Sequence, residues 1–191
     1  MSTGTPSRQD ALAFVTDIFA RRGAGAYLGE PVTMSQHMLQ CAHLAERAGA
    51  GDALIAAALL HDVGHFADEF AERMALEIDN RHEHAGAALL APWFPALVVD
   101  CVRHHVAAKR WLCATDPGYF AQLSPASVRT LELQGGPMDA AEAERFAALS
   151  HRDAIVRVRR WDDAAKDPAV AAPDFAHYVP CLERVLDLGP G

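Results

Sequence analysis

Apolar residues recur along this chain at intervals of three and four positions, which is the spacing of one face of an α-helix. No run alternates apolar and polar residues in the way that predicts a β-strand. The segment from Asp52 through Leu60 is apolar on all sides, so we expect it at the centre of the fold. The expected fold class is therefore all-α, with further helices over residues 7–23, 35–48, 82–91, 95–110, 139–163 and 174–187.

Two segments between these helices are expected to be irregular. Residues 23–33, GAGAYLGEPVT, read as a loop because glycine permits unusual backbone angles and Pro31 blocks a helix. Residues 111–137 contain further prolines and the pair Gly135-Gly136. No internal repeat or low-complexity linker divides the chain. We therefore expect a single domain over residues 1–191, with a metal-binding core at about 35–166, an N-terminal helix and loop at 7–33 and a C-terminal helix at 174–187.

Composition narrows the class of protein. A chain of 191 residues suffices for one well-cored domain, and its formal net charge of -8 argues against a nucleic-acid partner. No apolar run reaches the length of a membrane span and no signal-peptide pattern opens the chain, so we expect a cytoplasmic protein without a membrane partner. Oligomeric state is not encoded in this pattern. The four cysteines lack C-x-x-C spacing and are expected to be reduced structural thiols.

The ten histidines include one adjacent pair of potential ligands, His61-Asp62, in the run AALLHDVGH. An unpaired carboxylate at the end of such an apolar helix would cost several kcal/mol, so a cation is its natural partner. Neighbouring helical residues point about 100° apart. Asp62 could therefore bridge two cations while His61 binds one of them. Taken alone, the pair could equally be a hydrogen-bonded helix cap.

Further candidate ligands are distributed over about two-thirds of the chain, which excludes a local zinc clip. They predict a two-metal site lined by several helices, and they are His37, His82 or His84, His105, and Asp162 with Asp163 as the fallback. His82 and His84 lie about 200° apart on a helix, so only one of them should bind. His82 is favoured because it opens the pattern H-E-x-x-G-A, whose small residues allow another helix to approach. His104 and His105 pose a similar choice.

Cationic residues accompany two of these candidates. Lys109 lies one helical turn after His105, which suits an anionic substrate group as well as it suits a solvated lysine. Arg159, Asp162 and Lys166 share one helix face in RRWDDAAK. That face could line a cavity or could be a surface salt-bridge cluster.

The ordered set of His37, His61-Asp62, His82, His105 and Asp162 resembles the HD-domain superfamily, an all-helical, metal-dependent fold of mostly phosphohydrolases. Three segments narrow the resemblance: the loop from Tyr27 to Glu30, HVAAKRW and SPASVRTLELQGGP. These are similar to a small branch of mixed-valence di-iron oxygenases that cleave carbon–phosphorus bonds. The inositol oxygenase relatives match less well, because His65 stands where they would have a lysine.

The resemblance implies a role for each residue. One iron would be held by His37, His61, Asp62 and Asp162, and the other by Asp62, His82 and His105. Tyr27, hydrogen-bonded to Glu30, would ligate the second iron until substrate arrives, and His65 would lie near the substrate. The phosphonate would be bound by Lys109, Ser127, Gln134 and Arg159, and cationic and polar donors of this kind suit a dianion.

The implied cofactors are an Fe(II)/Fe(III) pair, with O2 as co-substrate. The implied partner is a small phosphonate, 1-hydroxy-2-amino- or 1-hydroxy-2-(trimethylamino)ethylphosphonate, which would yield phosphate and glycine or glycine betaine. An HD phosphohydrolase of nucleotides or phosphomonoesters would use a nearly identical ligand set. Tyr27 and Glu30 favour the oxygenase, because hydrolysis requires neither. A non-catalytic HD domain is disfavoured, because it has no need of every ligand type.

Overall fold

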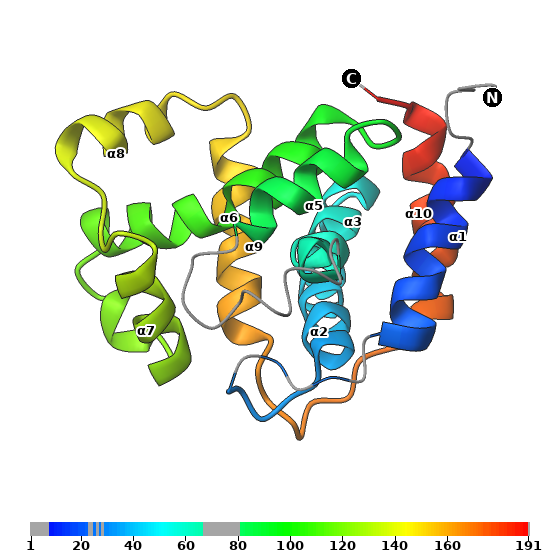
Figure 1. Cartoon of the computed structure of the whole chain (residues 1–191), viewed down its shortest axis with the longest axis horizontal. Coiled ribbons are helices and arrows are strands. Elements are labelled where there is room, and N and C mark those ends of the chain that lie inside the picture. The colour runs from blue at the N-terminus through cyan, green and yellow to red at the C-terminus, as the bar shows by residue number, and fades with distance from the viewer. Residues whose placement is uncertain (1–7, 23–24, 26, 28, 67–80, 191) are drawn as a thin grey trace.

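All regular elements in the described residues of the computed structural model, 8–22, 25, 27, 29–66 and 81–190, are helical (Figure 1). This confirms the all-α fold class. No helix in these ranges is both long and apolar enough to cross a membrane. In chain order the elements are α1 (Arg8–Asp17), a π-helical turn (Ile18–Arg22), α2 (Met34–Arg47), α3 (Asp52–Leu60), the 3-10 turn η2 (Val63–Phe66), α5 (His82–Leu90), α6 (Ala96–Thr115), the 3-10 turn η3 (Phe120–Gln122), α7 (Pro125–Leu133), α8 (Ala140–Ala147), α9 (Arg152–Ala164) and α10 (Phe175–Leu188).

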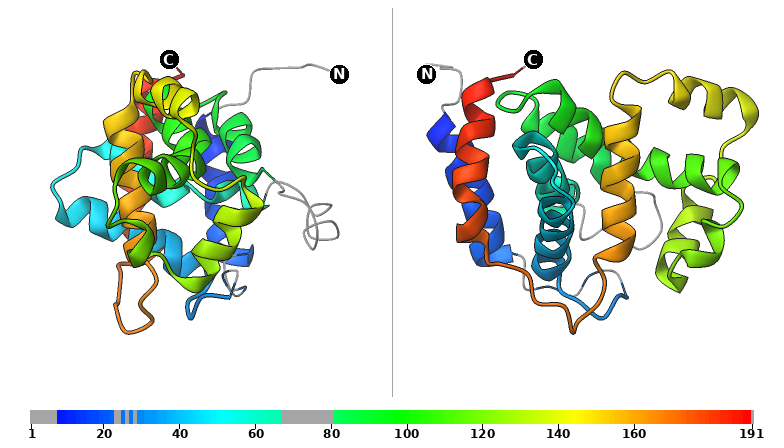
Figure 2. Two further views of the ribbon diagram at one scale, coloured as in Figure 1. Left: turned by 90° about the vertical axis from the view of Figure 1, so that its left-hand side faces the viewer. Right: turned by 180° about the vertical axis from the view of Figure 1, so that it is seen from behind.

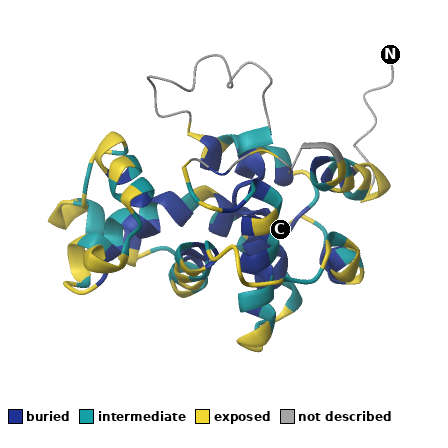
Figure 3. Ribbon diagram, turned by 90° about the horizontal axis from the view of Figure 1, so that it is seen from below, coloured by how far each residue is buried: buried dark blue, intermediate teal, exposed yellow. Residues whose placement is uncertain are grey.

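The apolar helix α3 lies at the centre of the fold, as its sequence predicts. Every residue from Leu54 to Leu60 is buried, and α3 packs against α2, α6, α9 and α10 (Figure 3). Its alanines let these neighbours approach closely, while Leu59 and Leu60 fill the space between them. The end of α3 therefore delivers His61 and Asp62 into the interior.

The helices at the two ends of the chain lie side by side. α1 contacts α10, the Phe19 ring stacks on the Phe175 ring at 4.6 Å between centroids, and Arg8 forms an ion pair with Asp187 (Figure 1). Helices α7 and α8 lie at the opposite side of the molecule. Helix α9 separates this pair from α2 and α3 (Figure 2). The site described below lies among the central helices.

Two expectations about helix boundaries are wrong. Residues 111–137 are not irregular throughout, since α6 continues to Thr115 and α7 follows. Ser124 caps α7 by accepting a hydrogen bond from the Ser127 amide at 3.1 Å, and Pro125 occupies the first helical position. Proline is favourable there because that amide needs no partner, so this proline starts a helix.

The single helix expected over residues 139–163 is two helices. Asp139 and Glu142 form a capping box at the start of α8, which ends at Ala147. At the break, His151 Nδ1 lies 2.8 Å from Asp100 Oδ2 on α6. The break lets α8 pack against α6, while α9 turns to pack against α2, α3 and α6.

A close backbone contact joins the turn after α3 to α5. A Cβ added to Gly64 would lie 1.8 Å from the His82 carbonyl oxygen and 2.7 Å from the Gly86 amide nitrogen. Only glycine fits at this position. The contact agrees with the expectation that small residues after His82 permit close packing, and it holds Asp62 and His82 near each other.

Candidate functional site

The six predicted ligand residues come together in one buried cluster. They come from separate elements: α2, the end of α3 and the residue after it, α5, α6 and α9. Each has at most 9% of its surface exposed, and they are His37, His61, Asp62, His82, His105 and Asp162. Residues from five helices therefore converge on one point of the core.

The first half of the cluster joins α2, α3 and α9. His37 Nε2 lies 3.1 Å from His61 Nε2 and 3.4 Å from Asp162 Oδ1. Asp62 Oδ2 lies 3.5 Å from His37 Nε2 and 3.4 Å from His61 Nε2. The ligand atoms of His37, His61 and Asp162 all lie within 4.8 Å of one another, so these three residues could hold a metal ion.

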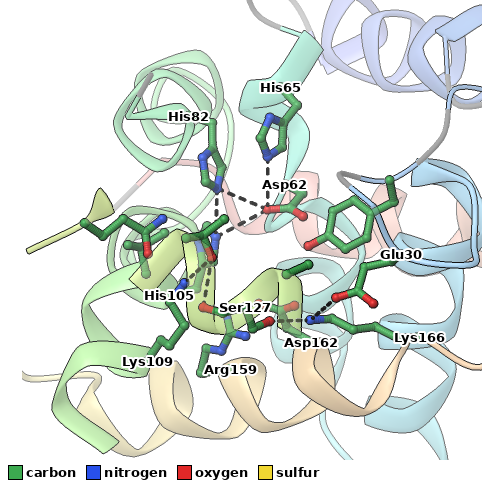
Figure 4. Close-up of a pocket in the computed structure, with 15 residues that line it drawn as sticks. Glu30, Asp62, His65, His82, His105, Lys109, Ser127, Arg159, Asp162 and Lys166 are labelled. Carbon is green, nitrogen blue, oxygen red and sulfur yellow. Dashed lines mark hydrogen bonds and ion pairs between the residues drawn. The ribbon is translucent and has the colours of Figure 1, made fainter. Parts of the chain in front are cut away.

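The second half uses the other oxygen of Asp62. Asp62 Oδ1 lies 3.3 Å from both His82 Nε2 and His105 Nε2, which are 3.1 Å apart (Figure 4). His65 Nε2 is somewhat farther from the same oxygen, at 3.9 Å, and its ring stacks on that of His82. The two oxygens of Asp62 thus face two different groups of imidazoles.

Backbone carbonyls fix the orientation of three of these imidazoles. The Nδ1 atoms of His37, His61 and His105 each lie 2.8 Å from the carbonyl oxygens of Ala165, Ala58 and Val102 respectively. A ring that donates from Nδ1 presents the lone pair of Nε2, which is how metal-binding histidines are held. The Nε2 lone pairs of His37 and His61 then face each other and repel unless a cation lies between them.

Buried oxygen atoms without partners support the same conclusion. Within the described residues, Asp62 Oδ2 and Asp162 Oδ1 are buried and accept no hydrogen bond. Burial acts to raise the pKa of Asp62, but the imidazoles of His61, His105 and His82 outweigh it and hold this pKa well below the usual value. Two buried anions with free oxygens, together with inward lone pairs, fit divalent or trivalent metal ions of the kind that imidazole and carboxylate bind.

The alternative ligands lie elsewhere. The His84 side chain is 60% exposed, and its Nδ1 lies 3.0 Å from Glu83 Oε1. Asp163 forms an ion pair with Arg159 and accepts a hydrogen bond from the Tyr119 hydroxyl. His104 lines a separate groove on the other side of α6.

A cavity opens beside the metal-ligand cluster. Its empty volume of about 440 Å³ includes space that is open to solvent. Its wall includes all seven residues to which the resemblance gives a catalytic or substrate-binding role, namely Tyr27, Glu30, His65, Lys109, Ser127, Gln134 and Arg159. Figure 4 labels Glu30, His65, Lys109, Ser127 and Arg159 among them. The structure therefore joins these residues to the metal-ligand cluster in one site.

Lys109 is a cation of this wall whose positive charge is not paired with a carboxylate among the described residues. Its Nζ donates to Thr130 Oγ1 at 2.8 Å, and this partner is neutral. Burial lowers the pKa of Lys109 to about 7, with the nearby Arg159 acting in the same direction. Gln134 Oε1, also in this wall, has no hydrogen-bond partner among the described residues. An anionic ligand would supply the missing charge to Lys109.

Arg159 links the cavity to the metal-ligand cluster. Its Nη1 lies 2.6 Å from Asp162 Oδ2, and its Nε lies 3.1 Å from Asp163 Oδ2 and 3.2 Å from the Tyr119 hydroxyl. Holding Asp162 by Oδ2 leaves Oδ1 directed at His37. Burial acts to raise the pKa of Asp162, but Arg159 outweighs it and lowers this pKa well below the usual value.

Two described residues that precede α2, Tyr27 and Glu30, line the site. The Tyr27 ring stacks on the His37 ring at 4.0 Å between centroids, and burial together with the nearby Asp62 carboxylate raises the pKa of its hydroxyl. The Glu30 amide donates to the Tyr27 carbonyl at 2.6 Å. The Glu30 carboxylate accepts from Ser124 Oγ at 2.5 Å and pairs with Lys166, so its side-chain partners differ from the Tyr27 hydroxyl that the resemblance implies.

Sequence reasoning did not assign several residues that complete the site. Thr130 accepts a hydrogen bond from Lys109. Tyr119 and Asp163 accept hydrogen bonds from Arg159. Lys166 lies in the cavity wall and donates a hydrogen bond to Ser127. For Lys166 the signal was present, because RRWDDAAK places it four residues after Asp162. The helix face expected to include Lys166 is wrong in one respect, since α9 ends at Ala164 and Lys166 follows it.

Comparison with known proteins agrees with this geometry. The HD domain model matches residues 34–157. The chain is 48% identical over 182 residues, 95% of this chain and 93% of the relative, to the [1-hydroxy-2-(trimethylamino)ethyl]phosphonate dioxygenase (glycine-betaine-forming) of Leisingera caerulea. It is 43% identical over 164 residues, 85% of this chain and 82% of the relative, to the hydroxymethylphosphonate dioxygenase of Gimesia maris. The uncharacterized protein L432 of Acanthamoeba polyphaga mimivirus is 31% identical over 80% of this chain and 71% of its own length. The chain is thus an enzyme of the HD-domain family and belongs, within that family, with the phosphonate dioxygenases rather than the phosphohydrolases.

Proposed function

We propose that this enzyme holds two iron ions and uses O2 to cleave the carbon–phosphorus bond of a 1-hydroxy-2-(trimethylamino)ethylphosphonate. In this proposal His37, His61, Asp62 and Asp162 bind one iron, and Asp62, His82 and His105 bind the other. The observation that carries it is the position of Asp62, whose two oxygens each lie within 3.5 Å of a separate pair of imidazole nitrogens. A bridging carboxylate of this kind sets two metals side by side.

The proposed reaction is a four-electron oxidation of the phosphonate by O2. The C1–H and C1–P bonds break, one oxygen atom of O2 bonds to C1 and the other to phosphorus, and a proton is released. C1 becomes the carboxylate of glycine betaine, phosphorus leaves as phosphate, and O2 accepts the four electrons. When bound, a redox-active iron pair supplies the activation of O2, which zinc or magnesium cannot supply.

The protein's own residues would bind and orient the substrate. The Lys109 ammonium would receive the phosphonate, since it faces the cavity and donates only to the neutral Thr130 among the described residues. Gln134 Oε1, an acceptor without a partner among these residues, would instead accept a hydrogen bond from the C1 hydroxyl. Ser127 would contribute a hydroxyl. Arg159 would act from behind the cavity wall, because its guanidinium already holds Asp162 and Asp163. Tyr27, stacked on His37, would cover the irons and keep water out until substrate displaces it.

The choice of substrate rests on the relatives. The relative that matches 95% of this chain is named for the trimethylated phosphonate, while the relative that matches 85% is named for hydroxymethylphosphonate. The primary amine, 1-hydroxy-2-aminoethylphosphonate, differs by three methyl groups and is the alternative. All three share the C1 hydroxyl and the phosphonate.

The test is phosphate release after exposure to O2. The protein is loaded with iron without oxygen, mixed with each of the three phosphonates and then exposed to O2. We expect phosphate and glycine betaine from the trimethylated compound, and neither product from the Asp62→Asn variant. Hydrolysis of a nucleotide or of p-nitrophenyl phosphate, without O2-dependent release from any phosphonate, would support the phosphohydrolase instead.

A further inference from the structure

His82 differs from the other three imidazoles of the metal-ligand cluster in what its Nδ1 atom faces. In His37, His61 and His105 this nitrogen lies 2.8 Å from a backbone carbonyl oxygen. The Nδ1 of His82 lies 3.7 Å from a side-chain oxygen, Glu83 Oε2. In the described part of the chain, His82 is therefore the imidazole of the cluster that has an anion next to Nδ1.

Glu83 is a buried carboxylate at the start of α5. The residue is 6% exposed, and its Oε1 lies 3.0 Å from Nδ1 of the exposed His84. Its Oε2 is buried and has no hydrogen-bond partner among the described residues. A desolvated carboxylate oxygen without a hydrogen bond is unfavourable, so Oε2 requires a donor. The neighbouring ring of His82 can supply this donor from Nδ1.

A carboxylate in the first turn of a helix also has a simpler role, which is to stabilise the positive end of the helix dipole. No side chain caps the N-terminus of α5, so Glu83 contributes to its stability in this way. An exposed carboxylate would fulfil that role equally well. The burial of Oε2 beside a metal-ligand residue is not explained by the helix dipole, and it points to an interaction with His82.

The His82 ring is held in the orientation that this interaction needs. It stacks on the His65 ring at 4.0 Å between centroids with 15° between the planes, which restricts its rotation (Figure 4). Its Nε2 lies 3.3 Å from Asp62 Oδ1, while its Nδ1 faces Glu83. A charge-assisted N–H···O bond is about 2.7–2.9 Å long, so the carboxylate must approach by roughly 1 Å from its distance of 3.7 Å. Rotation of the Glu83 side chain provides this movement.

We propose that Glu83 is a positioning residue of the metal centre and acts through His82. Its carboxylate accepts the Nδ1 proton of His82, which fixes the form of the ring whose Nε2 lone pair faces the metal. This inference rests on the proposed function, because it assumes that Asp62, His82 and His105 bind the second metal. It goes beyond that function by adding a residue that is neither a metal ligand nor part of the cavity wall.

The negative charge of Glu83 makes His82 a stronger donor than an imidazole held by a carbonyl group. The first half of the cluster has the opposite arrangement, because the Arg159 guanidinium pairs with Asp162 at 2.6 Å. A stronger donor raises metal affinity and favours the ion of higher charge. Glu83 should therefore lower the reduction potential of an iron bound by His82.

The first test measures affinity for zinc, which has no redox chemistry and needs no protection from O2. Chelator competition titrates both metal sites in the wild type and in Glu83→Gln, which keeps the shape of the side chain but removes its charge. We expect one zinc ion to bind about tenfold to a hundredfold more weakly and the other to keep its affinity. Glu83→Asp keeps the charge and should restore part of the loss. Unchanged affinity for both ions in Glu83→Gln would overturn the inference.

Asp153→Asn is the matched control for the loss of a carboxylate in a first helical turn. Asp153 lies in the first turn of α9, the helix that carries Asp162, and its side chain is 85% exposed. This variant should bind both zinc ions as the wild type does. An equal loss in Asp153→Asn and Glu83→Gln would mean that Glu83 acts only on its helix, which would overturn the inference. The melting temperature of each metal-free protein identifies a damaged fold.

The reduction potential separates a positioning role from a purely structural one. A redox titration of the iron-loaded protein, followed by electron paramagnetic resonance, should give a higher potential for Glu83→Gln than for the wild type and Asp153→Asn. A structural role of Glu83 predicts no shift.

Nitrogen NMR of the zinc-loaded wild type needs no substitution at Glu83. The His82 ring should carry its proton on Nδ1, with a low-field resonance that is absent from His82→Ala. A spectrum in which His82 binds zinc through Nδ1 would overturn the inference.

O2-dependent phosphate release distinguishes failure of this inference from failure of the proposed function. A wild type that binds two metals and gives the expected zinc and NMR results, but releases no phosphate, refutes the proposed reaction and supports the role of Glu83. Normal phosphate release, with unchanged zinc affinities and potential in Glu83→Gln, refutes the inference alone. A wild type that binds a single metal refutes both.

Discussion

The backbone contact between Gly64 and α5 makes Gly64→Ala the most informative single substitution. The added methyl carbon would lie 1.8 Å from the His82 carbonyl oxygen, and real Cβ atoms essentially never come nearer than 3.0 Å to another heavy atom. The turn after α3 and the start of α5 must therefore separate by about 1.2 Å, the difference between these two distances. Neither contacting atom belongs to a side chain that could rotate away.

This displacement falls directly on the second half of the proposed metal centre. His82 is the first residue of α5, and its Nε2 lies 3.3 Å from Asp62 Oδ1. Ligand distances in metal sites vary by only about 0.2 Å, so a shift of this size removes His82 from the coordination sphere. We expect Gly64→Ala to lose one metal per chain and to keep the one proposed for His37, His61, Asp62 and Asp162.

The expected change in stability follows from the same overpacking. Forcing a methyl group into a close-packed contact costs about 1–3 kcal/mol. For a chain of this size, that free energy lowers the melting temperature by about 2–12 °C. Metal analysis of the purified protein and thermal unfolding followed by circular dichroism measure the two effects separately.

Two other glycines provide graded controls. A Cβ at Gly86 would meet its nearest neighbours at 3.0 Å, and one at Gly118 would meet nothing closer than 3.6 Å. Gly86→Ala should therefore be milder than Gly64→Ala, and Gly118→Ala should keep both metals and the wild-type melting temperature. Two metals and an unchanged melting temperature in Gly64→Ala would refute the argument that this contact sets the distance from Asp62 to His82.

Two more predictions concern individual side chains. His82→Ala should lose one of the two metals, because the His82 ring faces Asp62. His84→Ala should keep both metals, because the His84 side chain is 60% exposed. Metal loss in His84→Ala would contradict the assignment. Burial lowers the pKa of Lys109 to about 7, so its ammonium form predominates below that pH and is lost as the pH rises through it. A phosphonate dianion favours the ammonium form, so binding at pH 8 should take up a proton, and affinity should fall as the pH rises. Calorimetry with hydroxymethylphosphonate in two buffers of different ionisation enthalpy measures this proton uptake. The Lys109→Met variant should show no uptake. Equal heats in both buffers for the wild-type protein would contradict the prediction.

The sequence predicts helices best where one physical signal dominates. α3 is apolar on every side, and α2 begins at a Thr33 capping box and ends near Gly49, so both helices were expected within one or two residues of their bounds. The errors lie where proline and glycine were taken only as signs of irregular structure. Pro125 begins α7, and the break between α8 and α9 depends on packing against α6 that a one-dimensional pattern does not contain.

For the site, the sequence predicts which residue types take part but only some of their partners. The order of histidines and aspartates predicted a cluster of ligands from several helices. The choice between neighbours such as His104 and His105 came from the resemblance to the HD-domain superfamily. The partners of the cations were not predictable, because they depend on segments far apart in the chain. Glu30 bonds to Ser124, 94 residues later, and Lys109 donates to Thr130 on α7. Arg159 pairs with two aspartates of its own helix but also contacts Tyr119, 40 residues earlier.

The end of one helix, α9, connects the proposed metal centre with the proposed substrate pocket. Asp162 lies on α9, the Ala165 carbonyl holds His37, and Lys166 reaches Ser127 and Glu30. These three residues span little more than one helical turn, so the end of α9 cannot shift without moving a ligand, the carbonyl that orients another ligand, and a cation of the pocket together. A change in the partners of Lys166 would therefore act within about one turn of Asp162. Because Lys166 also pairs with Glu30, it connects the proposed metal centre with a residue that lies close to Tyr27 in the chain.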